Sequence, residues 1–420
     1  MKILFITPLS PFEIESGGGV RTRKLWCALR QAGDVYTSVL KNFGDRYESR
    51  KPEENDRVKF IDPFNAKKIP VRNALMMALG AICHRMDWAF QNEHWIVNRL
   101  GWGDVKFDLV VTRFAWMNCQ VAAWKIAPLL IDIDDLPSED FNTLERPRLP
   151  RWKGFVKAWL INRWQAFSLR KARAAWIPNP FQMKIVERYC PCFYLPNIVD
   201  IPAERYDRLV SRKFEIISVG SFSYFANTLG VDWFLDNVWG ALHKKFPDLA
   251  YVIIGGRLEE KYKKKWSSIP GVTYAGFVRD LDQKYAESLA VVAPVFIGGG
   301  TAIKVLEAVA HGKKVFATPF ALRGLSKDQL KKANVDSFEN ADEFIAEFQR
   351  FLALTEEQRI AMAKEMRIMI CEEYSLGFFK QQIELAITQI SKERGARSTL
   401  GDSGLMRRKT VSNKLDDVCV

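Results

Sequence analysis

A glycine-rich turn that leads into a helix is the clearest chemical signal in this sequence. The stretch Phe296–Gly312 reads FIGGGTAIKVLEAVAHG, so that three successive glycines precede Thr301 and a strongly helical run. Glycines let the backbone approach an anion closely, and the free N–H groups and positive end of the following helix favour phosphate. A plain turn before an amphipathic helix is the alternative, but the full combination favours nucleotide binding.

The helix after this turn places three polar side chains on one face. Lys304, Glu307 and His311 recur at spacings of three and seven residues, and apolar residues occupy the opposite side. A carboxylate at this depth in the helix lies beyond the phosphate, where it can accept hydrogen bonds from both ribose hydroxyls. We therefore expect Glu307 at the ribose of a nucleotide and Lys304 near its phosphates.

A second glycine-rich element, Ser16–Gly19, follows the first apolar run and opens another helix. It matches neither the G-x-G-x-x-G dinucleotide fingerprint nor a P-loop. Arg21 and Arg23 lie near the positive end of this helix, where cations are unfavourable, so a nearby anionic ligand would explain them. A plain strand-to-helix turn explains the spacing equally well.

The elements that must position these residues form two successive series of strands and helices. Short Val/Ile/Leu-rich runs without strict alternation are typical of parallel strands buried on both faces, and helical stretches separate them. In the first half the expected strands are Lys2–Thr7, Val35–Leu40, Asp108–Arg113, Leu129–Asp132, Ala174–Ile177 and Cys192–Leu195. In the second half they are Phe214–Val219, Ala250–Ile254, Val272–Tyr274, Ala290–Pro294 and Lys314–Ala317.

This pattern predicts an α/β protein with two doubly wound domains. The boundary is expected near Leu195–Ser211, where prolines and charges interrupt the pattern. Phe344–Met369 and Leu376–Ile390 are expected to be helices. From about Ser391 the chain is rich in Ser, Gly, Arg and Lys, which predicts a flexible basic tail.

Composition narrows the class of protein. The 420 residues carry a formal net charge of +13, which favours acidic partners such as nucleic acid, anionic lipid headgroups or phosphorylated small molecules. The seven cysteines and four histidines form no zinc-binding pattern. The apolar run at Met1–Thr7 is too short for a signal peptide, and no run is long enough to span a membrane. We expect a cytoplasmic protein, soluble or peripheral at the inner face of the membrane.

Several stretches of the second half resemble the donor domain of the retaining glycosyltransferase family 4, the glycosyl transferases group 1. They read VGSFSYFANTLGVDWF, YVIIGG, VTYAGFVRD and GGGTAIKVLEAVAHGKKVFATPFALRGL, at Val219–Phe234, Tyr251–Gly256, Val272–Asp280 and Gly298–Leu325. In the first half, Gly17–Gly33 and Leu195–Asp200 match as well.

The resemblance implies a GT-B fold, in which two Rossmann-like domains face a cleft and the last helix crosses back to the first domain. Residues 1–200 would form the acceptor-side domain and 201–375 the nucleotide-sugar donor domain. Residues 376–392 would be the crossover helix and 393–420 the basic tail. The implied reaction is transfer from a nucleotide-sugar with retention of anomeric configuration, without a bound metal or other cofactor.

The resemblance also implies the positions of the donor. Glu307 would bind the ribose, Lys304 would lie at the diphosphate, and two residues would lie against the base. A loop of the second domain and a turn of the first would close around the sugar-phosphate. The remaining residues implied for the diphosphate are Gly299, Gly300 and Thr301; those for the base, Phe277 and Val278; and those for the two loops, Gly220, Ser221, Gly18, Gly19 and Arg21.

Three positions depart from the family pattern. Gly299 replaces the first glutamate of the E-x7-E motif, and the loop Ser221–Tyr224 lacks the usual arginine and lysine. Ala302 stands where an arginine is common. The diphosphate would therefore depend on Lys304, on backbone amides, and on Arg21 or Arg323.

A cluster of carboxylates follows an expected strand of the first domain. Leu130–Asp140 reads LIDIDDLPSED, and ligands of open α/β sheets bind at such strand ends. Asp134 and Asp135 are the candidates to take the acceptor hydroxyl proton or to orient sugar hydroxyls, with Asp132 inside the strand. Helix N-caps and a solvated loop are the alternative.

The stretch Arg151–Trp176 is basic and contains four tryptophans. Tryptophan together with lysine or arginine suits a membrane interface. Nucleic-acid binding would use the same residue types, and a long packing helix is the third possibility.

The leading hypothesis is a glycosyltransferase that acts on a glycan or lipid-linked acceptor in cell-surface polysaccharide or glycolipid synthesis. A nucleotide-sugar 2-epimerase would use the same architecture. A subunit that binds the donor without catalysis is a further alternative, as is a nucleic-acid-binding protein, which only the net charge favours.

Overall fold

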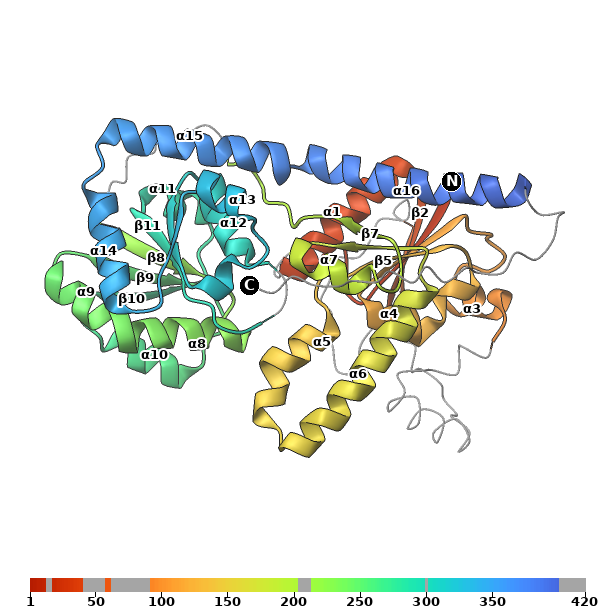
Figure 1. The fold of residues 1–420 in the computed structure, drawn as a ribbon, viewed down its shortest axis with the longest axis horizontal. Coiled ribbons are helices and arrows are strands. Elements are labelled where there is room, and N and C mark those ends of the chain that lie inside the picture. The colour runs from red at the N-terminus through yellow and green to blue at the C-terminus, as the bar shows by residue number, and fades with distance from the viewer. Residues whose placement is uncertain (13–16, 41–56, 62–90, 203–212, 299–300, 400–420) are drawn as a thin grey trace, which may run out of the picture.

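The computed structural model describes residues 1–12, 17–40, 57–61, 91–202, 213–298 and 301–399. These residues form two α/β domains, each built around one parallel sheet, and a long pair of helices runs along one side of both (Figure 1). The described residues contain no helix that is both long and apolar enough to cross a bilayer.

The first sheet has seven parallel strands in the order β3-β2-β1-β4-β5-β6-β7. The central strands coincide with the continuous apolar runs of the sequence, because helices cover both faces of the sheet and bury the side chains on each. The strands are β1 (Lys2–Thr7), β2 (Asp34–Leu40), β3 (Val58–Ile61), β4 (Leu109–Arg113), β5 (Leu129–Asp132), β6 (Ala174–Ile177) and β7 (Cys192–Tyr194). The helices are α1 (Gly17–Ala32), α3 (Glu93–Arg99), α4 (Ala115–Val121), α5 (Pro137–Asp140), α6 (Arg151–Lys171) and α7 (Pro180–Val186).

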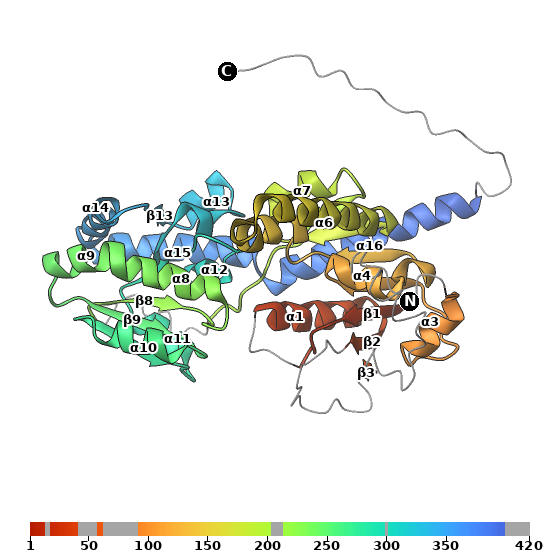
Figure 2. The same cartoon turned by 90° about the horizontal axis from the view of Figure 1, so that it is seen from below.

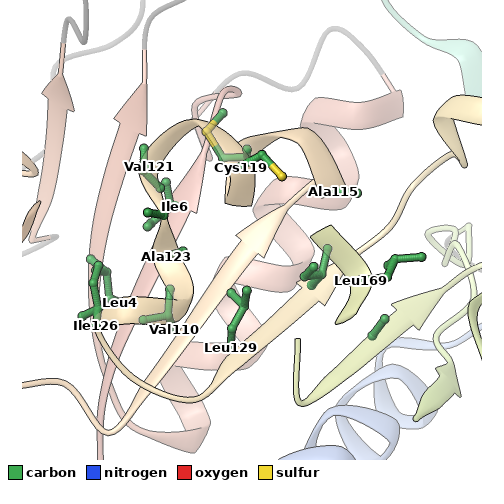
Figure 3. Packing of buried hydrophobic residues seen from close by; sticks show 14 of the residues in the cluster. Leu4, Ile6, Val110, Ala115, Cys119, Val121, Ala123, Ile126, Leu129 and Leu169 are labelled. Carbon is green, nitrogen blue, oxygen red and sulfur yellow. The ribbon is translucent and has the colours of Figure 1, made fainter. Parts of the chain in front are cut away.

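Apolar side chains on one face of this sheet pack under α4 and the inner end of α6. Figure 3 shows Leu4 and Ile6 of β1 beside Val110 of β4, with Leu129 and Leu169 further along the same layer. This layer fixes the carboxyl ends of β4 and β5, which carry the first domain's share of the candidate site.

The second sheet has six parallel strands in the order β10-β9-β8-β11-β12-β13. The strands are β8 (Glu215–Val219), β9 (Ala250–Ile254), β10 (Val272–Gly276), β11 (Ala290–Ala293), β12 (Lys314–Ala317) and β13 (Val335–Ser337). The helices are α8 (Phe225–Phe234), α9 (Gly240–Lys245), α10 (Glu260–Ser267), α11 (Leu281–Glu287), α12 (Ile303–Ala310), α13 (Lys327–Lys332), α14 (Ala341–Leu352) and α15 (Glu356–Glu373).

The last helix, α16 (Leu376–Thr399), crosses back to the first domain (Figure 2). Phe379, Ile383 and Ile387 share one apolar cluster with residues of β1, α1 and β6, which explains why the helix returns. The expected α/β architecture of two Rossmann-like domains with a returning helix is therefore confirmed.

The structure corrects the expected ends of the helices. The single helix expected over Phe344–Met369 is two helices, because Thr355 caps α15 through a reciprocal pair of hydrogen bonds with Gln358. The last helix continues through Thr399, so the first residues of the expected tail are helical. Two edge strands, β3 and β13, were not expected from the sequence. They are short, and edge strands carry weak apolar signals.

Candidate functional site

Lys304 lies in the first turn of α12, directly after the glycine-rich turn. Its ammonium group donates to the Oδ1 atom of Asn227 at 2.6 Å, and it lies beneath Gly220. Burial lowers the pKa of Lys304 to about 8, with the carboxylate of Glu307 opposing the shift. Gly299 and Gly300 lie outside the described residues; Thr301 is half-buried beside them.

The loop at Gly220 is held by close backbone packing against the end of β9. A Cβ atom on Gly255, where φ is +150°, would lie 1.7 Å from the carbonyl oxygen of Gly220. The Tyr274 hydroxyl donates to the Gly255 carbonyl at 2.7 Å. Because only glycine fits at position 255, the Gly220 loop can approach closely enough to lie over Lys304.

Glu307 lies one turn after Lys304 on the same face of α12. The Tyr285 hydroxyl donates to its Oε2 atom at 3.4 Å. Burial raises the pKa of Glu307 to about 7, although Tyr285, Lys304 and Lys24 favour the ionised carboxylate. Lys24 belongs to α1, so a cation of the first domain acts on the carboxylate of the second.

The side chain of His311 is engaged in contacts at the end of α12 and does not add a free polar group to the site. It is 7% exposed, its Nδ1 atom lies 2.7 Å from the Glu307 carbonyl oxygen, and its ring stacks on Tyr285. Its Nε2 atom lies 3.1 Å from a carboxylate oxygen of Asp282. These contacts end α12 and align Tyr285 with Glu307.

Phe277 and Val278, the two residues expected to lie against the nucleotide base, come directly after β10. Phe277 is 81% exposed, whereas Val278 is half-buried against the apolar core below α12. A large apolar ring held in solvent is available to a planar ligand. Ser221 is exposed on the neighbouring loop, where its hydroxyl lies 2.8 Å from that of Ser223.

Arg21 is buried at the start of α1 and is engaged by residues of the first domain. It is 3% exposed and makes a two-point contact with Asp132, with N–O distances of 2.5 and 3.1 Å. It also donates to Asn197 and to the backbone carbonyls of Leu195 and Pro196. Its donors are thus engaged inside the first domain, where they hold the start of α1 that carries the first glycine turn.

A second buried arginine completes this support. Arg113 donates to Asp132 at 2.5 Å, to Asp134 at 2.9 Å and to the Gly18 carbonyl at 3.2 Å. Although burial opposes ionisation, Arg21 and Arg113 hold the pKa of Asp132 below its usual value. The ion pairs fix Gly18, and the buried Gly19 after it, at the start of α1.

Within the carboxylate cluster after β5, Asp135 and Asp140 each have an oxygen that could accept a further hydrogen bond. Among the described residues, neither Oδ1 atom has a hydrogen-bond partner, although both are buried. Burial raises the pKa of Asp140 to about 6, opposed by Arg323. Burial, Asp134 and Asp140 together raise the pKa of Asp135 well above its usual value. Asp134, in contrast, is paired with Arg113.

The two domains meet at these residues. A Cβ atom on Gly17 would lie 3.0 Å from the Ile303 side chain, so the start of α1 faces the start of α12. Thr143 donates to the Gly298 carbonyl, and Thr301 donates to the Pro178 carbonyl, each at 3.4 Å. Arg323 also donates to the Gly298 carbonyl, at 2.5 Å. The carboxylates of the first domain therefore lie beside the glycine-rich turn of the second.

Four residues of this arrangement were missed at the level of sequence: Asn227, Tyr285, Lys24 and Asp140. Asn227 and Tyr285 come from helices distant in the chain, so no local spacing links them to α12. Asp140 belongs to the carboxylate cluster that was noted, but its buried oxygen depends on the turn of α5. The position of Lys24, about one turn after Arg21 on the same helix, was the one local signal that a further cation could reach the site.

Part of the chain matches a known protein family. The family described as "Glycosyl transferases group 1" matches residues 213–353, and the resemblance to this family is confirmed over those residues. No curated protein matches the chain in sequence.

Solved structures share the whole fold at low sequence identity. Sucrose-phosphate synthase from Thermosynechococcus elongatus has a TM-score of 0.68 at 14% identity and covers 94% of this chain and 100% of its own. Trehalose 6-phosphate synthase from Burkholderia multivorans has a TM-score of 0.60 at 11% identity, covering 97% and 99%. HepE from Anabaena, solved with UDP, has a TM-score of 0.58 at 13% identity, covering 93% and 100%. Together with the two sheets, these similarities identify the fold as GT-B.

Proposed function

We propose that this chain, whose second domain matches the glycosyl transferases group 1, transfers a sugar from a nucleotide-sugar to a glycan or lipid-linked acceptor with retention. The observation that carries the proposal is the pairing of Lys304 and Glu307 on α12, directly after the glycine-rich turn and beneath the Gly220 loop. A cation and a carboxylate one turn apart there suit a diphosphate followed by a ribose.

The diphosphate would lie at the start of α12. There the free N–H groups and the helix dipole favour negative charge, and Lys304 adds a cation that Asn227 holds in place. As the bond from the sugar to the diphosphate breaks, negative charge grows on the departing phosphate, and these fixed donors stabilise it without reorganising. We propose that this electrostatic support serves in place of a bound metal.

The ribose and base would extend along the helix and across β10. Glu307 would accept hydrogen bonds from the ribose hydroxyls, and the exposed ring of Phe277, with Val278 behind it, would cover the base. Gly18, Gly19 and the start of α1 would close over the sugar-phosphate, with Arg21 and Arg113 holding that turn from below.

The acceptor would bind at the carboxylates of the first domain. Asp135 and Asp140 have buried oxygens without partners among the described residues, so acceptor or donor hydroxyls could supply the missing hydrogen bonds. Asp134, which is paired with Arg113, would orient the group. The acceptor oxygen would attack from the side of the departing phosphate, which would take its proton. Sugar transfer to a lipid-linked acceptor would also bring a cytoplasmic enzyme to the inner face of a membrane.

The first test is calorimetric titration of UDP, GDP, ADP, CDP and dTDP into the wild-type protein and Glu307→Ala. UDP and UDP-glucose come first, because HepE structures have been solved with both. We expect one nucleotide to bind and to bind at least about tenfold more weakly in the variant, since hydrogen bonds to a charged group contribute about 1.5–3 kcal/mol. Glu357→Ala, an exposed glutamate on α15, is the control. Equal affinity in wild type and Glu307→Ala would remove the ribose assignment.

The alternatives differ in their products. Conversion of the nucleotide-sugar without any acceptor would indicate an epimerase. Nucleotide binding that leads to no transfer with any acceptor would indicate a donor-binding subunit.

A further inference from the structure

The outer half of α6 presents a continuous apolar stripe to solvent. Trp152, Phe155, Val156 and Trp159 are exposed to 67%, 67%, 48% and 51%. Their spacings of three, four and seven residues place them within an arc of about 100° on a helix with 3.6 residues per turn. Large apolar side chains in such an array are unusual on a surface that contacts only water.

The packed face of α6 fixes this orientation. Buried residues lie on the opposite side, from Gly154 to Leu169, and Trp164 is part of the core below. Asn118 of α4 donates to the carbonyl and hydroxyl oxygens of Ser168, both at 3.2 Å. The Ser168 hydroxyl donates to the Ala115 carbonyl at 2.6 Å. The helix is therefore held firmly at its inner end while its outer end stands away from the body (Figure 1).

The charged residues of α6 itself all have one sign, and the nearby carboxylate of Glu145 is paired with Lys157 on the other side of the helix. The 21 residues of α6 read RWKGFVKAWLINRWQAFSLRK, with lysines and arginines and no aspartate or glutamate. Arg151 and Lys153 flank the stripe on either side, about 100° from Trp152. Lys153 lies 5.4 Å from the centre of the Trp152 ring. Amphipathic indole rings between cations suit the headgroup region of an anionic bilayer.

We propose that the α6 surface, meaning Trp152, Phe155, Val156 and Trp159 with Arg151 and Lys153, docks on an anionic lipid bilayer. Charge decides between this partner and a second copy of the chain. Two α6 surfaces brought together would oppose Arg151 and Lys153 to the same residues of the second copy. The helix has no carboxylate to pair them, and the neighbouring Glu145 is already engaged by Lys157. A bilayer with anionic headgroups satisfies the cations and the apolar stripe together.

The same helical hairpin leads to the candidate site. Asp140 ends α5, and Thr143, in the turn that follows, donates to the Gly298 carbonyl of the second domain. Docking through α6 would thus place the acceptor carboxylates close to the membrane, where a lipid-linked acceptor emerges. This last step rests on the proposed function, whereas the docking itself does not.

The test is co-sedimentation of the full-length protein with vesicles of phosphatidylglycerol and phosphatidylcholine, compared with phosphatidylcholine alone. We expect binding to the anionic vesicles at low salt and a decrease at high salt. The triple variant Trp152→Ser/Phe155→Ser/Trp159→Ser should lose at least about tenfold in vesicle affinity. Ile368→Ser/Leu385→Ser removes exposed apolar side chains from α15 and α16 and should bind like the wild type.

A second pair of variants tests whether vesicle binding depends on the cations of α6 or only on the net charge of the protein. Arg151→Gln/Lys153→Gln should weaken binding, whereas Lys261→Gln/Arg350→Gln removes as many exposed cations from the second domain and should weaken it little. Equal loss in both would overturn the proposal, because net charge alone would explain it. Binding of the wild type equally to neutral vesicles, or to none, would also overturn it.

Two measurements without vesicles test whether a second copy of the protein, or another segment of the same chain, covers the apolar stripe instead. Sedimentation should show that the wild type and the triple serine variant have the same oligomeric state. A dimer that this variant dissociates would assign the stripe to a second copy. Acrylamide should quench a larger share of the tryptophan fluorescence in the wild type than in the triple serine variant, because Trp152 and Trp159 are exposed. Equal quenching would mean that another segment of the chain shields the stripe. Nucleotide titration in the same samples keeps the two proposals separate, since loss of vesicle binding should leave nucleotide affinity unchanged.

Discussion

The ammonium group of Lys304 on α12 lies 2.6 Å from the side-chain oxygen of Asn227 on α8. This contact crosses from the helix after β11 to the helix after β8, the two neighbouring strands at the centre of the second sheet. The side chain of the proposed phosphate ligand is therefore held by a neutral partner that does not cancel its charge. Burial lowers its pKa to about 8, so the ammonium form predominates at neutral pH but is lost within the mildly alkaline range.

The role of Asn227 can be separated from that of Lys304. Asn227→Ala should weaken nucleotide-sugar binding about tenfold, because the ammonium group loses the hydrogen bond that positions it. Lys304→Met should weaken it at least as much. In a double-mutant cycle, Asn227→Ala should add little in the Lys304→Met background, since Asn227 acts through Lys304. Independent effects of the two changes would show that Asn227 contacts the ligand directly.

Donor affinity should depend on pH with a maximum between about 7 and 8. Glu307 accepts ribose hydroxyls as a carboxylate, and its pKa of about 7 means that affinity falls as the pH decreases below that value, by up to about tenfold per unit. Above about pH 8, Lys304 loses its charge and affinity should fall again. Titration of UDP-glucose is suitable, because its phosphates do not ionise in this range. Glu307→Gln should lack the acidic limb, and an unchanged acidic limb in that variant would assign it to another group.

Breaking the buried ion pairs at Asp132 should strongly destabilise the first domain. Asp132→Asn leaves two buried arginines with one partner fewer and should cost about 3–5 kcal/mol in denaturant unfolding. Asp236→Asn, which removes an exposed partner of Lys265, should cost less than about 1 kcal/mol. The folded-state pKa of Asp132 is depressed, so its stabilisation is present above the usual carboxyl pKa and is lost as the pH falls through the folded value. A wild-type-like unfolding midpoint in Asp132→Asn would contradict this account.

Because the Gly220 loop lies so close to the end of β9, alanine should be tolerated much less well at Gly255 than at the adjacent Gly256. Gly255→Ala would place a Cβ atom 1.7 Å from the Gly220 carbonyl oxygen and should destabilise the second domain by about 1–3 kcal/mol while weakening donor binding. Gly256→Ala is the matched control, because its nearest neighbour, the Phe277 Cβ atom, would lie 3.8 Å away. Thermal unfolding and nucleotide titration should therefore show lower stability and weaker binding for Gly255→Ala than for Gly256→Ala. Similar behaviour would mean that the loop tolerates displacement.

Local sequence predicted the parts of this protein that depend on neighbouring residues. The apolar runs at β1, β5, β6, β9 and β12 were located with their observed bounds, because a strand buried on both faces needs continuous apolar residues. The glycine-rich turn and the face of α12 with Lys304 and Glu307 followed from helix geometry. The short edge strands β3 and β13 carry too few buried residues to be recognised in this way.

Tertiary structure decided which of these residues are available to a ligand. Arg21 lies at the start of a helix, where its sequence position suggested a phosphate ligand, but the end of β5 brings Asp132 against it and engages its guanidinium. Asp140 gains a buried oxygen that has no hydrogen-bond partner in the described part of the chain only because α5 turns inward. On α6, Trp164 is buried and Trp152 exposed, since α4 covers only the inner end of the helix. Spacing along the chain determines which side chains share a face, whereas the elements that pack against that face determine whether they bind each other or remain free for a partner.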